Sequence, residues 1–181
     1  MSEIKTISGV MIDPARPRPE LIVIHDVAHA LSMLCRANGH FIHFYSVGQH
    51  CLNCAAEARA RGLSTRLQLA CLLHDASEAY LSDVTRPVKE ELPAYLTIEK
   101  PLQDMIWKKY LGTPLTPQEE AQVFEIDDEM LYYEFEHLGE MALVDRLPRL
   151  ERVPELDFTG FSDTKQNFLA LFEQLSSGQN G

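Results

Sequence analysis

Apolar residues recur with the period of an α-helix along most of the chain, and polar residues occupy the positions between them. Side chains that cap helices stand where several of these patterns begin: Asp26, Ser46, Ser64 and Thr116. Thr116 is followed by proline at the first helical position and by a glutamate within the first turn. The pattern predicts helices at about 27–37, 46–61, 64–81, 93–111, 117–137 and 162–177.

Two segments lack the helical period. Residues 6–12 alternate as in a short strand, a proline-rich loop follows, and residues 21–24 are predicted to be a second short extended piece. Residues 145–160 contain two prolines and are expected to be irregular. The sequence therefore predicts an all-α fold with a minor β element near the N-terminus. We expect one domain over 1–181, with an extended N-terminal segment at 1–24 and a polar tail at 176–181.

The charge balance limits the partners of the protein. The chain has 181 residues, with 27 Asp and Glu against 16 Lys and Arg, and a formal net charge of -11. This excess argues against long nucleic acid or an anionic membrane as a partner, because both are bound mainly through Lys and Arg. A small anionic substrate remains compatible with it where a bound divalent cation makes the field locally positive.

The sequence predicts neither a membrane span nor a secretory signal. The longest apolar stretch, residues 67–73, is far shorter than the roughly 20 residues that a spanning helix needs. The N-terminus has no cationic region followed by an apolar core. We therefore expect a cytoplasmic protein with four reduced thiols: Cys35, Cys51, Cys54 and Cys71.

Four residues form the main candidate for a functional site: His50, His74, Asp75 and Asp127. His74 and Asp75 follow an apolar run, where ionisable side chains need a partner or a metal ion because burial of a lone charge is costly. Glu78 follows one turn later, and on one helix these three side chains would share a face. Two imidazoles and two carboxylates from three helices suit a divalent ion with positions left open for water and substrate.

The order of these residues resembles a known family. The segments S-V-G-Q-H at 46–50, L-L-H-D-A-S-E at 72–78 and I-D at 126–127 resemble the HD-domain metal-dependent phosphohydrolases. The sixteen residues H-D-A-S-E-A-Y-L-S-D-V-T-R-P-V-K at 74–89 are similar to the bacterial 5′-deoxynucleotidase branch of that family. The resemblance covers roughly residues 6–140. It implies an all-α helical bundle that hydrolyses deoxynucleoside 5′-monophosphates, usually as a homodimer.

The resemblance also implies roles for individual residues. One divalent ion (Mn, Co, Fe, Zn or Mg) would be held by His50, His74, Asp75 and Asp127. Glu78 and Asp75 would assist proton transfer in catalysis. The phosphorylated substrate would be contacted by Arg36, Asp83, Thr85, Arg86 and Lys89.

Two positions differ from the family pattern, and three functional hypotheses follow. Ala37 stands where the nucleotidase has an aromatic residue, and Gln49 stands where it has a glutamate. The first hypothesis is a phosphohydrolase of small phosphorylated metabolites, above all (deoxy)nucleoside monophosphates. The alternatives are an HD-type triphosphohydrolase of dNTPs and a non-catalytic module that binds nucleotide.

Two other motifs have simpler interpretations. His25 and His29 are spaced as in a zinc-binding helix, but Asp26 as the N-cap places His25 before the helix begins. Cys51 and Cys54 form a lone C-x-x-C, without a second pair or a βαβ pattern. We interpret these cysteines as helix-packing residues, with a structural zinc or redox role as the alternative.

The acidic residues after Tyr110 are interpreted mainly as a solvated helix face. Ten Asp and Glu and no Lys or Arg occur between Tyr110 and Asp145 inclusive. Asp127 is the expected exception, and its neighbour Asp128 is the ligand if the register differs by one. The loop residues before the Ser46 helix include His40 and His43, which we expect to be solvated or to reach the mouth of the pocket.

Overall fold

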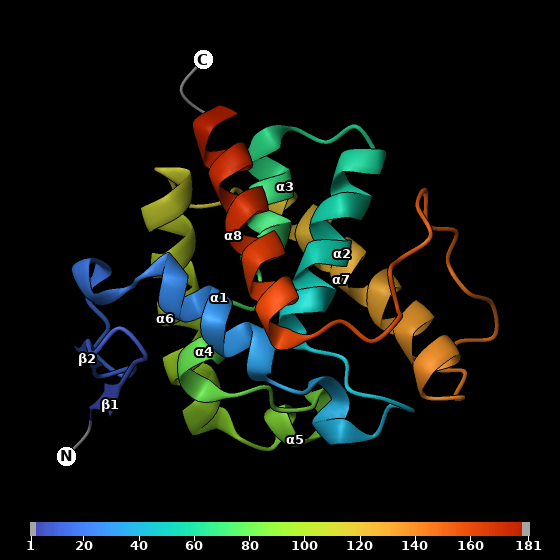
Figure 1. Cartoon of the computed structure of the whole chain (residues 1–181), viewed down its shortest axis with the longest axis horizontal. Coiled ribbons are helices and arrows are strands. Elements are labelled where there is room, and N and C mark those ends of the chain that lie inside the picture. Colours follow the sequence, from blue (N-terminus) through green and yellow to red (C-terminus); the bar gives the residue numbers. More distant parts are fainter. Residues whose placement is uncertain (1–2, 179–181) are drawn as a thin grey trace.

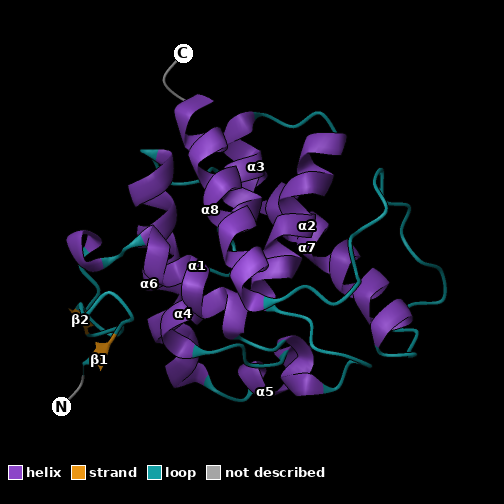
Figure 2. Ribbon diagram, in the orientation of Figure 1, coloured by secondary structure: helices purple, strands orange, loops and turns teal. Residues whose placement is uncertain are grey.

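The computed structural model describes residues 3–178, and helices account for nearly all of its regular structure (Figure 1, Figure 2). In chain order the helices are α1 (Ile24–Met33), α2 (Val47–Ala60), α3 (Thr65–Leu72), α4 (Glu78–Leu81), α5 (Arg86–Glu90), α6 (Pro93–Leu111), α7 (Pro117–Leu138) and α8 (Phe161–Ser177). The 3₁₀ turns η1 (Pro19–Leu21) and η2 (Arg36–Gly39) lie on either side of α1. The predicted all-α class with a minor β element near the N-terminus is confirmed.

Helix α2 lies among the other helices, where it contacts α1, α3, α7 and α8 (Figure 1). Apolar side chains of these helices form a common core that includes Val47, Leu72, Ile126 and Phe168. Polar residues of α2 that face its neighbours are therefore removed from water, and His50 is 0% exposed.

Local capping explains where the long helices begin. Ser46 and Ser64 each accept a hydrogen bond from the backbone N–H three residues later. Thr116 and Glu119 form a capping box at the start of α7, with Pro117 at its first position. The observed bounds of α2, α6, α7 and α8 lie within one residue of the predicted ones. The predicted polar tail begins inside α8, and residues 179–181 lie outside the described residues.

The continuous helix predicted at 64–81 is wrong at its centre. Helix α3 ends at Leu72, α4 begins at Glu78, and turns connect them. The side chain of Gln103 on α6 explains the break, because its Nε2 donates to the Leu73 carbonyl at 2.8 Å and its Oε1 accepts from the Ser77 N–H at 3.0 Å. In an unbroken helix those two backbone groups would bond to each other. The inserted amide therefore replaces one helical hydrogen bond.

The N-terminal segment also differs from the prediction. Residues 6–12 do not form one strand, because β1 (Ile4–Lys5) and β2 (Met11–Ile12) pair as an antiparallel hairpin. Gly9 in its turn has φ of 87°, a conformation that glycine adopts without steric cost. Of the predicted extended piece at 21–24, only Ile22 and Val23 have extended backbone, since η1 ends at Leu21 and α1 begins at Ile24.

Asp26 is not the N-cap of α1. Val23 occupies that position, and Asp26 lies inside the first turn. Its buried carboxylate accepts hydrogen bonds from the Ser8 N–H at 3.0 Å and from the Ser8 hydroxyl at 2.6 Å. Asp26, which the sequence predicts as the cap of α1, therefore connects the hairpin to that helix.

The connection from α1 to α2 passes through left-handed backbone. Helix α1 ends at Met33, earlier than predicted, and Asn38 and Gly39 belong to η2. Ala37, Asn38 and Gly39 have φ of 54°, 52° and 79°. The preceding residue, Arg36, is held by a hydrogen bond from its N–H to the Tyr45 carbonyl, and its side chain is buried.

The predicted irregular segment between α7 and α8 is confirmed, and part of it is fixed to α2. We call residues 151–157 the strap. Gln49, Asn53 and Glu57 hold it and are spaced four residues apart on α2. Gln49 donates to the carbonyls of residues 155 and 157, Asn53 bonds both backbone groups of residue 155, and Glu57 accepts from the N–H groups of residues 151 and 152.

Candidate metal centre

Three parts of the chain bring the predicted metal ligands together. His50 lies in the first turns of α2, His74 and Asp75 lie in the turns between α3 and α4, and Asp127 lies in α7. Nε2 of His50 is 3.2 Å from Nε2 of His74 and 3.0 Å from Oδ1 of Asp127. Oδ2 of Asp75 is 3.2 Å from Nε2 of His74 and 3.9 Å from Nε2 of His50. All four predicted ligands therefore lie in one cluster.

The outer hydrogen bonds of the histidines define their tautomers. Nδ1 of His74 is 2.7 Å from the Cys71 carbonyl, which can only accept, so this nitrogen carries the hydrogen. Nδ1 of His50 is 2.7 Å from Oε1 of Glu134, and the Glu134 pKa is lowered because His50 and Arg36 outweigh the effect of burial. Glu134 is therefore an ionised acceptor. In the neutral imidazoles both Nε2 atoms are then unprotonated and face each other.

The residues present fit a divalent cation. Ligand atoms that bind one ion at about 2.0–2.2 Å lie about 3–4 Å from one another, as these atoms do. The carboxylates of Asp75, Asp127 and Glu134 exceed the guanidinium of Arg36 by two negative charges, which one divalent ion would neutralise. Burial would raise the pKa of Asp75, but His74 lowers it to about 2, so this ligand is ionised at neutral pH.

The electrostatics of the histidine pair also favour a bound cation. Burial lowers the pKa of both imidazoles, but the negative groups around them more than reverse this effect. The pKa of His50 and that of His74 are both raised well above the ordinary value. A positive charge at this position is therefore favoured, whether a proton or a metal ion supplies it.

Glu134 is a central residue of the site that the sequence analysis missed. It is 0% exposed, whereas we had interpreted it as part of a solvated acidic face. Its carboxylate accepts from Nε of Arg36 at 2.8 Å, from the Tyr45 hydroxyl at 2.8 Å and from His50. Its position seven residues after Asp127, two turns along the same helix face, is a signal that could have identified it.

Arg36 lies beside the ligand cluster, as the resemblance implied. Its Nη1 is 3.6 Å from Asp75 and its Nη2 is 3.6 Å from Asp127. Because Glu134 binds its Nε, the guanidinium is fixed with both terminal nitrogens directed at the ligand carboxylates.

Glu78 lies at the start of α4, in a buried position next to the cluster. Burial, followed by the charges of Asp75 and Asp83, raises the pKa of Glu78 well above its usual value. Oε2 of Glu78 has no hydrogen-bond partner among the described residues, and Oε1 is 3.6 Å from Nζ of Lys89. Lys89 also donates to Glu99 at 2.6 Å.

The remaining predicted substrate contacts lie near the rim of this site. Arg86 is about half exposed and donates to Asp128 at 2.6 Å, and its Nη2 is 4.0 Å from Asp127. Asp127, rather than Asp128, therefore lies against the histidines. The half-buried Thr85 is the N-cap of α5, and its carbonyl accepts from the N–H of Lys89.

Two cysteines of α2 also approach the histidines, in keeping with the zinc alternative to the helix-packing role that the sequence favours for them. Sγ of Cys54 is 3.5 Å from Nε2 of His50. The buried side chains of His50, Cys54 and His74 could hold a metal ion, because their ligand atoms lie within 4.8 Å of one another. Cys51, His74 and Asp75 form a second such group.

The rival histidines are not part of this centre. His25 lies within α1, so its predicted position before the helix is wrong. It is exposed and His29 is half-buried, and neither belongs to a group of metal-binding side chains in the part of the chain that the structure describes. His40 is exposed, and His43 bonds to the Leu156 carbonyl of the strap at 2.8 Å.

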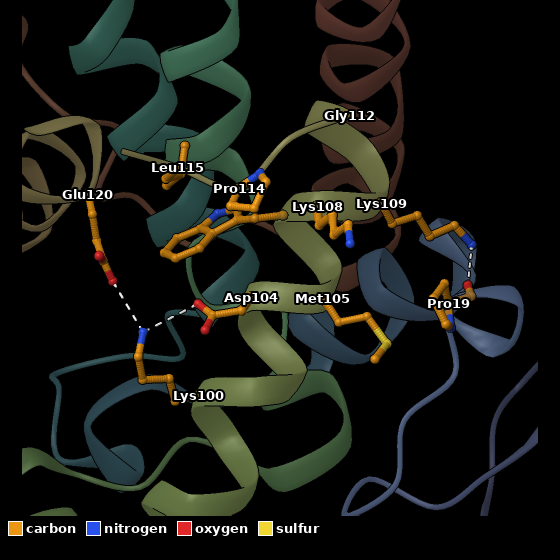
Figure 3. A pocket seen from close by; sticks show the side chains of 11 residues that line it. Pro19, Lys100, Asp104, Met105, Lys108, Lys109, Gly112, Pro114, Leu115 and Glu120 are labelled. Carbon is orange, nitrogen blue, oxygen red and sulfur yellow. Dashed lines mark hydrogen bonds and ion pairs between the residues drawn. The ribbon is translucent and has the colours of Figure 1, made fainter. Parts of the chain in front are cut away.

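A separate hollow of about 560 Å³ lies along α6 (Figure 3). Its charged lining is largely paired, since Lys100 bridges Asp104 and Glu120, and Lys109 donates to the Pro19 carbonyl. It contains none of the residues singled out from the sequence.

The described residues thus define an all-α protein with a buried His, Asp and Cys cluster able to hold a metal ion. No protein-family profile matches the chain. The chain is 40% identical over 114 residues to the uncharacterized protein YfdR of Escherichia coli, a match that covers 63% of this chain and 61% of YfdR. It is 41% identical over 90 residues to an uncharacterized protein of Rhodobacter capsulatus, covering 47% of this chain and 45% of that protein. The matches thus span less than two thirds of either relative's length.

Within residues 3–178, the structure contains no helix that is both long and apolar enough to cross a membrane.

Proposed function

We propose that this protein is a metal-dependent phosphohydrolase of the HD-domain type. The observation that carries the proposal is the close approach of Nε2 of His50 and Nε2 of His74, 3.2 Å apart, with Asp75 and Asp127 beside them. The outer nitrogens are bonded to Glu134 and to the Cys71 carbonyl, so a cation held by the two inner nitrogens would complete the site. The order of these residues and the segment at 74–89 support the assignment to this family.

His50, His74, Asp75 and Asp127 would hold the ion. A bound divalent ion would neutralise part of the phosphate charge and lower the pKa of a water molecule from about 15.7 toward 7. Glu134 and the Cys71 carbonyl keep both imidazoles in the tautomer that such an ion requires.

Glu78 is suited to donate a proton to the leaving group. Its buried position raises its pKa and so favours the protonated carboxyl, which can transfer its proton to the departing alkoxide oxygen. Asp75, held ionised by His74, would accept a proton or a hydrogen bond from the attacking water.

Three cations near the cluster would bind the phosphate. Arg36 is already oriented by Glu134, and Lys89 lies beside Glu78. Arg86, more exposed at the rim, is placed for a part of the substrate that extends toward solvent. Together with the ion, they would make this part of an acidic protein attractive to an anion.

The substrate class that we propose is the (deoxy)nucleoside 5′-monophosphates. The segment at 74–89 supports it, because its resemblance is to the deoxynucleotidase branch. Asp83 is half-buried, and the charges of Arg36 and Asp75 both affect its pKa, so it belongs to the same region as the proposed phosphate-binding groups. The same resemblance makes a homodimer part of the proposal, and we also propose the cytoplasmic location expected from the sequence.

A phosphate-release assay over a panel of nucleotides tests this function. The chelated protein would be supplied in turn with Mn, Co, Fe, Zn or Mg, and we expect metal-dependent release of phosphate from monophosphates. Release of tripolyphosphate from dNTPs would instead identify a triphosphohydrolase. Nucleotide binding without turnover under every metal would identify a non-catalytic module.

Variants of the cluster connect the activity to the site. Asp75→Asn and His74→Ala should abolish the metal-dependent activity. Asp163→Asn, on the exposed first turn of α8, is the matched control and should retain it. Full activity in Asp75→Asn with its metal retained would reject the assignment.

A further inference from the structure

The proposed hydrolysis gives no role to the thiols that lie beside the histidine pair. Cys51 and Cys54 are buried, and Cys71 is buried behind them at the end of α3. Cys51 and Cys71 are near His74, since this residue influences the pKa of both thiols. Cys54 lies one helical turn after His50, so its side chain shares the face of α2 that carries the ligand.

Cys54 is close enough to bind the same ion as the histidines. Its Sγ is 3.5 Å from Nε2 of His50, which is the nitrogen proposed to bind metal. That nitrogen therefore has Asp127 at 3.0 Å, His74 at 3.2 Å and a thiol at 3.5 Å around it. The ligand atoms of His50, His74 and Cys54 all lie within 4.8 Å of one another, as do those of Cys51, His74 and Asp75.

The two kinds of donor around the histidines prefer different ions. Carboxylates suit Mg and Mn, imidazole suits Zn, Fe and Co, and a thiolate strongly favours Zn. Imidazole and thiolate ligands occur together in many zinc sites, whereas Mn and Mg are bound mainly through oxygen. The same two histidines thus belong to an oxygen-rich donor set and to a sulfur-containing one.

We propose that Cys54 is a ligand for thiophilic ions, so that His50, His74 and Cys54 give this centre a selectivity for Zn²⁺ over Mn²⁺. The proposal rests on the metal site of the proposed function and specifies its ion. Binding forms a Zn–S bond as the Cys54 thiol gives its proton to solvent or buffer, with no change of oxidation state. Oxygen-preferring ions would bind through the histidines and carboxylates without displacing that proton.

X-ray absorption of the zinc-loaded wild-type protein tests the ligand directly and needs no variant. We expect one sulfur at about 2.3 Å together with nitrogen and oxygen at about 2.0–2.2 Å. A zinc shell with nitrogen and oxygen alone would overturn the proposal. The manganese-loaded protein is the comparison and should show no sulfur.

Affinity measurements identify which thiol is bound. Cys54→Ser should weaken Zn²⁺ binding more than about tenfold, because loss of a ligand should cost at least as much as loss of a group that only orients one. The Mn²⁺ affinity should remain within about twofold, which also shows that the variant is folded. Cys35→Ser, at the half-buried cysteine outside both groups, should change neither affinity.

The outcomes separate this proposal from the proposed function. Equal loss of Zn²⁺ and Mn²⁺ affinity in Cys54→Ser, or no loss of either, would reject the selectivity role of Cys54. Phosphohydrolase activity with manganese would then still stand. Failure of the wild-type protein to bind any divalent ion would instead remove the metal site on which both proposals depend.

Discussion

Glu134 joins four parts of the protein through a single buried carboxylate. It binds Arg36 from η2, Tyr45 from the loop before α2, and His50 from α2, while its own backbone belongs to α7. The contacts with Arg36 and His50 orient groups that lie in the ligand cluster or beside it. The position of the histidine and the direction of the guanidinium therefore depend on one side chain.

We predict that Glu134→Gln weakens metal binding by about 10–100-fold, the usual effect of losing a group that orients a metal-binding histidine. The amide keeps the shape but loses the charge, and its NH₂ group cannot accept from the donors that now surround it. Titration against a chelating dye measures the affinity. Glu136→Gln, two residues along on the exposed face of α7, is the control and should bind as wild type. Unchanged binding in Glu134→Gln would show that it does not orient the site.

The role of Glu134 could not be read from composition alone. In the sequence it is one of ten acidic residues without a Lys or Arg among them, which is typical of a solvated helix face. Its partners come from residues more than eighty positions away. The His-Asp pair and Asp127 could be predicted because their spacing matches a family pattern, whereas the signal for Glu134 is only its spacing of seven residues from Asp127 on the same helix face.

At the scale of elements, the break between α3 and α4 sets the position of His74 and Asp75. Gln103 stabilises that break by bonding the two backbone groups that an intact helix would have paired. An unbroken helix was the natural prediction, because residues 64–81 are rich in Leu and Ala and contain no proline or glycine. Nothing local signals the break, since its cause lies on α6.

Gln103→Leu should lower the free energy of unfolding by roughly 1–3 kcal/mol, because it leaves the buried Ser77 N–H without its partner and removes one of the two hydrogen bonds of the Leu73 carbonyl. It should also weaken metal binding, since the turns that carry His74 lose their support. Chemical denaturation and the dye titration measure the two effects. Gln166→Leu, on the exposed face of α8, should change neither. Stability equal to wild type in Gln103→Leu would show that water replaces the amide at no cost.

The start of α7 gives a pH-dependent prediction. The hydrogen bond from Arg66, followed by those from Thr116, holds the pKa of Glu119 below its ordinary value. A lowered pKa in the folded state means that the ionised carboxylate adds stability above the unfolded pKa of about 4.3, and that this is lost as the pH falls through the folded pKa.

Glu119→Gln should therefore be less stable than wild type at pH 7 by up to about 1 kcal/mol, because the pair is partly exposed. The difference should shrink as the pH is lowered from 5 to 3. Urea denaturation at several pH values measures it. A difference that does not vary with pH would show that the charge of Glu119 is not involved.

Helix bounds that depend on nearby residues were predictable. The caps of α2 and α7 are formed by side chains within three residues of the helix start, and their bounds were confirmed. Asp26 has the right chemistry for a cap but is used by Ser8 of the hairpin, eighteen residues away. The same carboxylate can satisfy either partner, and tertiary contacts decide which.

At the scale of the whole molecule, the net charge of -11 is unevenly distributed. Part of it is buried at one point, where Asp75, Asp127 and Glu134 surround the histidines and Arg36 is the buried cation beside them. Folding brings these carboxylates together around the histidines, which makes the position between the imidazoles favourable for a cation.

A bound ion should therefore stabilise the fold as a whole. At a free concentration one hundred times its Kd, Mn²⁺ or Zn²⁺ should raise the free energy of unfolding by about 2.7 kcal/mol if it binds only the folded state. Thermal denaturation with and without metal, after chelation, measures the change. His74→Ala should lose most of the shift. An equal shift in that variant would place the ion elsewhere.

Helix α2 fixes the path of the strap through the strap's backbone, so this path depends little on the strap's own side chains. Within the strap, Gln49, Asn53 and Glu57 bind backbone groups only, and most side chains of the strap, from Glu151 to Val153 and at Glu155, are exposed. The path of the strap is thus specified by residues that lie about a hundred positions earlier in the sequence. Apart from the buried Pro154 and the half-buried Leu156, side chains of the strap could be replaced to carry an epitope or a fluorophore, while the course of its main chain stays the same.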